Sequence, residues 1–308
     1  MQLPGDLDIT AGGSIGSEDA PLSAAVGGGI TAEAPDGVHI AGYGDVNIKD
    51  ITSDSDVTVS ADGDMTGSGK NTHIDAPHVE LDSLTGSVGT EKEPIRLDTD
   101  SLSGSAKDDF AVQDKDDLEI GSIDAGGKAD ITAGGDITAA PGETPNISAG
   151  EAELDAQGDI GTREDPIRVN ADKITAEGED IALDIKGDTT IHQIKGDDIV
   201  INAEGDVYGD PDLPKQDYHI IGDSLELTAK GDIGTEEEPL RILVPGKVKI
   251  ESVYGDVHYQ NYYEPETGTG TPGTPTTGGE EALLPIAMMF LAAAMCLALA
   301  RRRRKQGA

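Results

Sequence analysis

Large aromatic side chains, cysteine and positive charge are all scarce in this chain of 308 residues. Two phenylalanines, seven tyrosines and no tryptophan cannot form a thick globular core built around large rings. One cysteine excludes a disulfide framework within the chain and a cysteine-based metal cluster. The 22 Lys and Arg against 60 Asp and Glu give a formal charge of −38, without the clustered cations that bind phosphate backbones. We therefore expect no nucleic-acid partner and no cofactor.

One motif, written four times, organises the chain. Its copies are G-S-I-G-S-E-D-A-P-L-S from Gly13, G-S-V-G-T-E-K-E-P-I-R from Gly86, G-D-I-G-T-R-E-D-P-I-R from Gly158 and G-D-I-G-T-E-E-E-P-L-R from Gly231. The second glycines of the copies, Gly16, Gly89, Gly161 and Gly234, are 73, 72 and 73 residues apart. Such a constant and long period indicates a tandem repeat that contains smaller units.

Short alternating segments that end in Gly-Asp form the smaller units. Val57–Ala61 leads to Gly63-Asp64, and Ile199–Ala203 leads to Gly205-Asp206. Alternation with a period of two predicts half-buried strands, and the glycines suit tight corners. Further Gly-Asp corners at Gly187 and Gly205 predict three turns of about 24 residues per repeat.

These patterns predict an all-β fold in which residues 1–263 form a parallel β-solenoid of about ten rungs and about 50 Å in length. A β-sandwich or propeller fits less well, because propeller blades of about 40 to 50 residues do not divide the repeat evenly. The first residues show no basic region followed by an apolar one, so we expect no signal peptide. Because the repeat is already under way at these residues, we expect either the C-terminal piece of a longer protein or an open reading frame begun late.

Candidate catalytic and metal-binding residues are few. The six histidines show no shared register and no partner motif: His39, His73, His78, His192, His219 and His258. Abundant acids leave a calcium-stabilised β-roll open, although its nine-residue repeat is missing. Arg96, Arg168 and Arg241 end three copies of the motif and are expected to pair with neighbouring acids. We predict no catalytic residue, no metal site and no enzymatic activity.

Tyrosines crowd towards the end of the repeats, at Tyr208, Tyr218, Tyr254, Tyr259, Tyr262 and Tyr263. They are expected to cap the last rung, since terminal repeats are atypical. A stacking platform for sugars is the alternative.

The composition changes after Tyr263. Residues 264–279 form a Pro/Gly/Thr-rich linker, which we expect to be disordered, and residues 280–308 hold an apolar segment and a basic tail. The 19 residues from Ala282 to Ala300 are long enough to cross a bilayer as one helix. The cluster Arg301, Arg302, Arg303, Arg304 and Lys305 is expected to stop transfer and to leave the repeats outside the cell.

This C-terminal order resembles the sorting signal of Gram-positive cell-wall proteins, an L-P-x-T-G pentapeptide followed by an apolar segment and a basic tail. The pentapeptide here is Thr274, Pro275, Thr276, Thr277 and Gly278, with Thr274 in place of leucine. The resemblance implies that a sortase cuts between Thr277 and Gly278 and joins Thr277 to peptidoglycan. A plain membrane anchor is the alternative.

The G-D-I-G-T repeats are similar to the β-helical shafts of filamentous-haemagglutinin-type adhesins. That resemblance implies a shaft or adhesin. Together with the sorting-signal resemblance, it leads us to expect a cell-wall-anchored stalk or adhesin, with host or microbial glycans or proteins as partners. The alternative is a wall-attached carbohydrate-binding or carbohydrate-active β-helix enzyme, which requires acids and aromatic rings gathered on one concave face.

Overall fold

Short strands joined by tight corners make up the computed structural model, which describes residues 5–69, 71–142 and 145–263. Its 26 strands are β1 Leu7–Thr10, β2 Leu22–Ala24, β3 Gly29–Glu33, β4 Val38–Gly42, β5 Val46–Thr52, β6 Val57–Ala61, β7 Met65–Gly67, β8 Ile74–Asp75, β9 His78–Ser83, β10 Ile95–Asp98, β11 Ser101–Ala106, β12 Phe110–Asp114, β13 Leu118–Ala125, β14 Lys128–Ala133, β15 Ile137–Ala139, β16 Ile147–Ala156, β17 Ile167–Glu177, β18 Ile181–Ile185, β19 Thr189–Lys195, β20 Asp198–Ala203, β21 Val207–Gly209, β22 Ile220–Ile221, β23 Ser224–Ala229, β24 Leu240–Leu243, β25 Val248–Ser252 and β26 Tyr259–Asn261.

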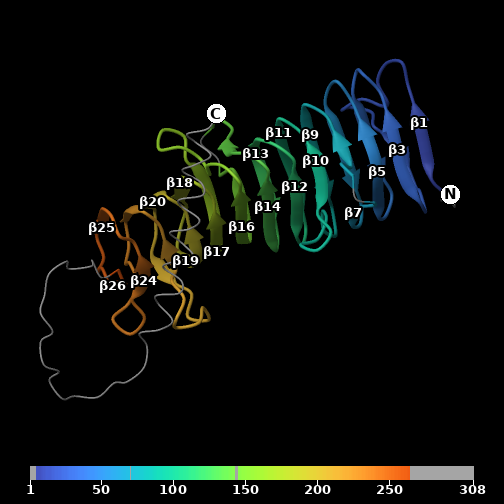
Figure 1. The fold of residues 1–308 in the computed structure, drawn as a ribbon. Coiled ribbons are helices and arrows are strands. Elements are labelled where there is room, and N and C mark those ends of the chain that lie inside the picture. Colours follow the sequence, from blue (N-terminus) through green and yellow to red (C-terminus); the bar gives the residue numbers. More distant parts are fainter. Residues whose placement is uncertain (1–4, 70, 143–144, 264–308) are drawn as a thin grey trace, which may run out of the picture. The chain divides into compact units, whose positions relative to one another are not determined.

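The strands lie in two stacks of a parallel β-solenoid, and the chain crosses from one stack to the other at its corners (Figure 1). The first stack holds β1, β3, β5, β7, β8, β10, β12, β14, the last parts of β16 and β17, β19, β21, β22, β24 and β26. The second stack holds β2, β4, β6, β9, β11, β13, β15, the first parts of β16 and β17, β18, β20, β23 and β25. The parallel solenoid predicted from the sequence is confirmed.

Seven half-turns make up each repeat, so a repeat contains three and a half turns rather than the predicted three. We number the repeats from the motif glycines, so that repeat 1 begins at Gly16, repeat 2 at Gly89, repeat 3 at Gly161 and repeat 4 at Gly234. In repeat 2 the chain passes through β10, β11, β12, β13, β14, then β15 with the first part of β16, and last the end of β16. A 73-residue period therefore has about 21 residues per turn instead of about 24. The described solenoid has about 13 turns rather than ten, which at about 4.8 Å per turn is about 60 Å.

An odd number of half-turns puts successive copies of the motif on opposite stacks. Gly89 and Gly234 precede strands of the first stack, β10 and β24, whereas Gly161 precedes the second-stack part of β17. Equivalent residues of repeats 2 and 4 therefore share a side of the solenoid.

Aliphatic residues fill the space between the two stacks. In β6, Val57, Val59 and Ala61 are at most 3% exposed, while Thr58 and Ser60 between them face outward. Each inward residue lies beside its equivalent in the next turn, as Val59 lies beside Leu81. The alternation in the sequence is therefore the alternation between core and surface.

Aspartates at the corners join successive turns through a device that we call the aspartate ladder. One carboxylate oxygen of each aspartate accepts the main-chain N–H of the equivalent residue one turn later, at 2.8 Å from Asp159 to Asp136. The bonds from donor to acceptor are Asp64 to Asp45, Ser87 to Asp64, Lys128 to Asp109, Asp136 to Asp117, Asp180 to Asp159, Asp198 to Asp180, Asp206 to Asp188, Asp232 to Asp206 and Asp256 to Asp232.

The aspartate ladder also explains the glycine of each Gly-Asp corner. A Cβ on Gly158 would lie 1.9 Å from Oδ1 of Asp136, and one on Gly231 would lie 1.9 Å from Oδ1 of Asp206. The carboxylate of one turn fills the space that a side chain would need in the next. Where Asp116-Asp117 replaces Gly-Asp, Asp117 still accepts the bond from the next turn.

We expect Asp136→Ala to lower the free energy of unfolding by about 1 to 2 kcal/mol, because the half-buried N–H of Asp159 loses its acceptor. Asp136→Asn keeps an acceptor oxygen and removes one charge from an acidic row, so its melting temperature should equal or exceed that of the wild type. Circular dichroism melts of the two variants test this. Equal losses for Ala and Asn would show that the charge, and not the hydrogen bond, matters.

Candidate functional site

The predicted sorting and membrane residues lie outside the described residues. These are the motif at residues 274–278, the basic cluster at residues 301–305, the apolar segment at residues 282–300 and the linker at residues 264–279. The corresponding predictions stay predictions. In the part of the chain that the structure describes, no helix has the length and apolar character needed to cross a membrane.

The repeated motif folds into one loop shape in all four copies. Its glycines, Gly16, Gly89, Gly161 and Gly234, have left-handed φ values of 62° to 70°. In repeat 3, Thr162 N–H donates to Asp165 O at 3.0 Å, and Thr162 Oγ1 accepts the Asp165 N–H at 3.0 Å. Pro166 then leads directly into β17. The motif therefore encodes a tight loop that returns to the stack through a proline.

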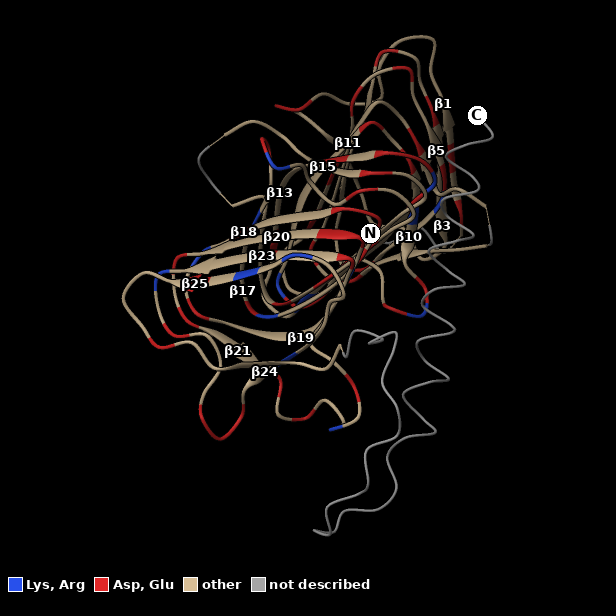
Figure 2. Cartoon of the chain, turned by 60° about the vertical axis from the view of Figure 1, so that its left-hand side comes forward, with Lys and Arg blue, Asp and Glu red and all other residues tan. Residues whose placement is uncertain are grey.

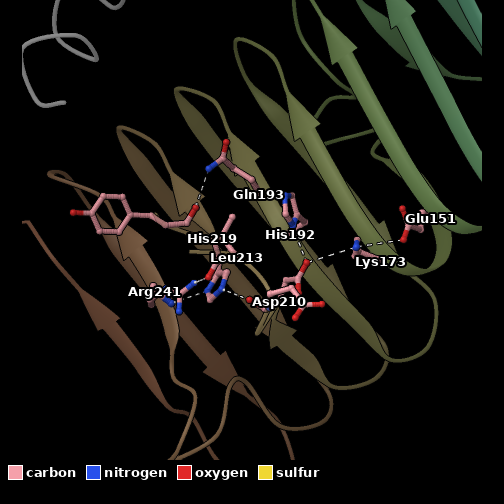
Figure 3. A network of polar contacts seen from close by, with 10 residues as sticks. Glu151, Lys173, His192, Gln193, Asp210, Leu213, His219 and Arg241 are labelled. Carbon is pink, nitrogen blue, oxygen red and sulfur yellow. Dashed lines mark hydrogen bonds and ion pairs between the residues drawn. The ribbon is translucent and has the colours of Figure 1, made fainter. Parts of the chain in front are cut away.

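The arginine that ends the motif reaches back to a loop of the preceding turn. Arg241 Nη2 donates to Leu213 O at 3.0 Å (Figure 3). Arg241 Nε donates to Asp217 O at 3.1 Å. The planar guanidinium suits such paired acceptors. Equivalent bonds run from Arg96 to Asn71 O at 2.9 Å and to Gly69 O, and from Arg168 to Ala140 O at 2.6 Å.

A buried histidine or asparagine completes this arrangement, which we call the clasp. His219 N–H donates to Arg241 O at 2.9 Å, and His219 Nδ1 accepts the Arg241 N–H at 3.0 Å. Asn146 makes the same two main-chain bonds with Arg168, at 2.8 and 3.1 Å. His73 makes them with Arg96 at 2.7 and 3.1 Å. Each clasp therefore joins one repeat to the next.

The size of the histidine or asparagine side chain in each clasp is matched to the size of the residue that it packs against. A Cβ on Gly209 would lie 2.2 Å from Cε1 of His219, and one on Gly67 would lie 1.9 Å from Cε1 of His73. In the repeat that uses the smaller Asn146, the equivalent position is Ala139. Glycine thus accompanies the imidazole, and alanine accompanies the amide.

Two predictions about these residues are wrong. His73 and His219 do share a register, because His73, Asn146 and His219 are each 73 residues apart. Arg96 and Arg241 bind main-chain carbonyl oxygens rather than the expected acids. The spacing was a visible signal, but a search restricted to histidines misses it because the middle copy is asparagine.

The clasp predicts a pH dependence of stability. Burial, and then the charge of Arg96, lower the pKa of His73 to about 4, whereas an unfolded histidine titrates near about 6.5. The stability that the neutral His73 imidazole contributes is fully present above about pH 6.5 and is lost as the pH falls towards 4. Asparagine is the residue at the same position of the clasp that Asn146 forms with Arg168. We therefore expect His73→Asn to reduce the loss of unfolding free energy between pH 7 and pH 4 by up to about 3 kcal/mol.

Denaturant unfolding at both pH values measures this difference. The exposed His78→Asn is the control for losing a histidine. A wild-type pH response in His73→Asn would contradict the assignment.

A second polar cluster ties four successive turns of the first stack together (Figure 3). Asp210, with its side chain 5% exposed, lies 2.7 Å from His192 Nδ1 and 3.6 Å from Lys173 Nζ. Lys173 also lies 3.3 Å from Glu151. Burial alone would raise the pKa of Asp210, but hydrogen bonds from His192 and the Asp212 N–H hold that pKa below its usual value. The cluster thus fixes the His192 ring and keeps Asp210 ionised.

A polar cleft of about 290 Å³ crosses β10, β12 and β14 of the first stack, beside the clasp of Arg96. Asp114, 2% exposed, accepts the N–H groups of Thr99 at 3.1 Å and Asp116 at 2.9 Å. Burial raises the pKa of Asp114 to about 6. The cleft is lined by Thr72, Arg96, Leu97, Gln113, Asp114, Lys115, Thr132, Ala133, Gly134 and Gln157. No motif or spacing in the sequence predicts this cleft.

The tyrosines near the end of the described solenoid differ in their surroundings. Tyr218 and Tyr262 contact each other with ring centroids 5.3 Å apart, whereas Tyr254 is 86% exposed and Tyr259 is 44% exposed. The cap over the last rung and the alternative sugar platform both stay predictions.

Acidic residues recur at corners and strand ends along the described solenoid (Figure 2). Among the described residues, no group of three or more His, Cys, Asp or Glu is arranged to hold a metal ion.

Comparisons with known proteins identify only part of the chain. A family model described as repeats of unknown function (DUF5649) matches residues 107–161, less than half of the chain. The match runs from the end of β11 to the left-handed glycine of repeat 3. No curated protein and no solved structure matches.

Proposed function

We propose that this chain is the C-terminal part of a non-enzymatic surface protein of a Gram-positive bacterium. In this proposal the β-solenoid is a stalk or adhesive shaft, and a sortase joins the C-terminal motif to peptidoglycan. The repeats then stand outside the cell.

One observation carries the proposal: the residues that recur between repeats bind neighbouring turns. Corner aspartates accept N–H groups from the next turn, and the motif's arginines bind loops of the preceding turn. The repeat therefore preserves stacking, which favours a shaft over a catalytic scaffold. The order of pentapeptide, apolar segment and basic tail in the sequence supports wall attachment.

Mass spectrometry of C-terminal peptides released from purified cell walls by a peptidoglycan hydrolase tests the attachment. We expect a peptide that ends at Thr277 and carries a fragment of the wall cross-bridge. Thr277→Ala should abolish this peptide, whereas Thr269→Ala, in the same linker but outside the motif, should leave it unchanged. An intact tail through Ala308 in the membrane fraction would contradict sortase attachment and favour a plain membrane anchor.

A further inference from the structure

The polar cleft beside the clasp of Arg96 lies at a place where repeat 2 differs in sequence from repeat 3. Strand pairing places Leu97, Asp114, Ala133 and Ala156 in one row of repeat 2, and Val169, Ile185, Ala203 and Ala229 in the equivalent row of repeat 3. The buried carboxylate of Asp114 thus occupies a position at which repeat 3 has the apolar Ile185.

In repeat 3 the equivalent surface is occupied by side chains that bind one another. Asn202 donates to Asp184 at 2.9 Å. Glu204 lies 3.0 Å from Lys186 and 3.5 Å from Lys230. The corresponding residues of repeat 2 are Thr132 for Asn202, Gln113 for Asp184, Gly134 for Glu204 and Gln157 for Lys230. The loss of the Glu204 side chain, with its two ion pairs, leaves the space open.

Each charge that lines the cleft has a partner. Lys115 Nζ lies 2.7 Å from an oxygen of Asp98, and Arg96 donates to main-chain carbonyl oxygens. Both oxygens of Asp114 accept N–H groups. No charge is therefore left over to select a charged ligand, and the acidic surface of the solenoid repels anions.

Amide and hydroxyl groups remain for recognition. The side chains of Gln113, Gln157 and Thr132 make no hydrogen bond to the described residues. They lie on three successive turns and border one cleft. Neutral donors and acceptors that converge in this way match the hydroxyl groups of a polyol.

We propose that this cleft binds a neutral polyhydroxylated ligand, of one or two sugar rings. Its volume of about 290 Å³ is at the lower end of ligand sites. Binding in this cleft requires only the folded solenoid and does not depend on how the chain is attached to a cell.

Saturation-transfer NMR and calorimetry on the full chain test the proposal, with maltose, lactose and chitobiose as probes. We expect at least one of these neutral sugars to bind. Glucuronic acid should bind at least tenfold more weakly than that sugar. Failure of all three neutral sugars to bind, or tighter binding of glucuronic acid, would overturn the proposal.

A variant that carries repeat 3 residues at the equivalent positions of repeat 2 tests whether the sugar binds in the cleft. Gln113→Asp combined with Thr132→Asn introduces the Asp–Asn pair that spans the equivalent surface in repeat 3. It should weaken sugar binding at least tenfold while leaving the melting temperature near that of the wild type. Asn202→Thr is the control, because it breaks the sister pair without contacting the cleft, and its sugar binding should equal that of the wild type. Undiminished binding by the double variant would place the sugar elsewhere and reject the cleft.

Discussion

Gly161→Ala is expected to lower the free energy of unfolding by about 3 kcal/mol or more, whereas Gly187→Ala should cost about 1 kcal/mol. Both glycines have left-handed backbones, with φ of 62° and 83°. A Cβ on Gly161 would lie 2.7 Å from Ala182 O and from Ile167 N, while a Cβ on Gly187 would meet nothing within 4 Å. The pair therefore separates the cost of backbone conformation from the cost of close approach.

Hydrogen exchange followed by mass spectrometry is the suitable measurement, because a repeat array can open locally. Gly161 N–H donates to Ile137 O at 2.7 Å, and Ala182 N–H donates to Ile160 O at 2.8 Å. These amides should exchange faster in Gly161→Ala than in Gly187→Ala. Equal protection in the two variants would mean that the loop adjusts and that the close approach does not matter.

Arg241→Ala is expected to release the loop between β21 and β22 and to cost about 2 to 4 kcal/mol. Arg241 is 6% exposed, and its removal leaves the carbonyl oxygens of Leu213 and Asp217 without their donor. Lysine carries a point charge instead of a planar fork, so Arg241→Lys should recover little of the loss.

Arg163→Ala is the matched control. The Arg163 side chain is 60% exposed, and its ion pair with Glu226 at 2.9 Å is of the surface type that contributes about 0 to 1 kcal/mol. Limited proteolysis should cut residues 210–219 faster in Arg241→Ala and at the wild-type rate in Arg163→Ala. Similar cleavage of the two variants would show that the clasp does not hold this loop.

Part of the clasp can be predicted from the sequence and part cannot. The motif, its period and its arginine are all visible in the sequence, and so is the 73-residue spacing of His73, Asn146 and His219. The acceptors of Arg241 are main-chain carbonyl oxygens, which every residue carries. No residue type marks such a partner, so the expectation of acidic partners was reasonable and wrong.

The cleft could not be predicted from the sequence for a related reason. Gln113, Gly134 and Gln157 are common surface residues, and nothing local distinguishes them. They become a site only because three successive turns place them side by side. Their difference from repeat 3 has meaning only once the strand register defines which positions are equivalent.

Alternation and turn chemistry within a few neighbouring residues were enough to predict the strands, the Gly-Asp corners and the aliphatic core, and the recurrence of the motif every 72 or 73 residues was enough to predict the parallel solenoid. Three features depend on how turns that are distant in the sequence stack on one another: the three and a half turns of a repeat, the alternation of equivalent clasps between the two stacks, and the atoms that the arginines bind. The number of turns depends on how many times the chain crosses between the stacks. Some corners carry no Gly-Asp, and β16 and β17 each continue from one stack to the other, so the crossings cannot be counted from the repeated letters.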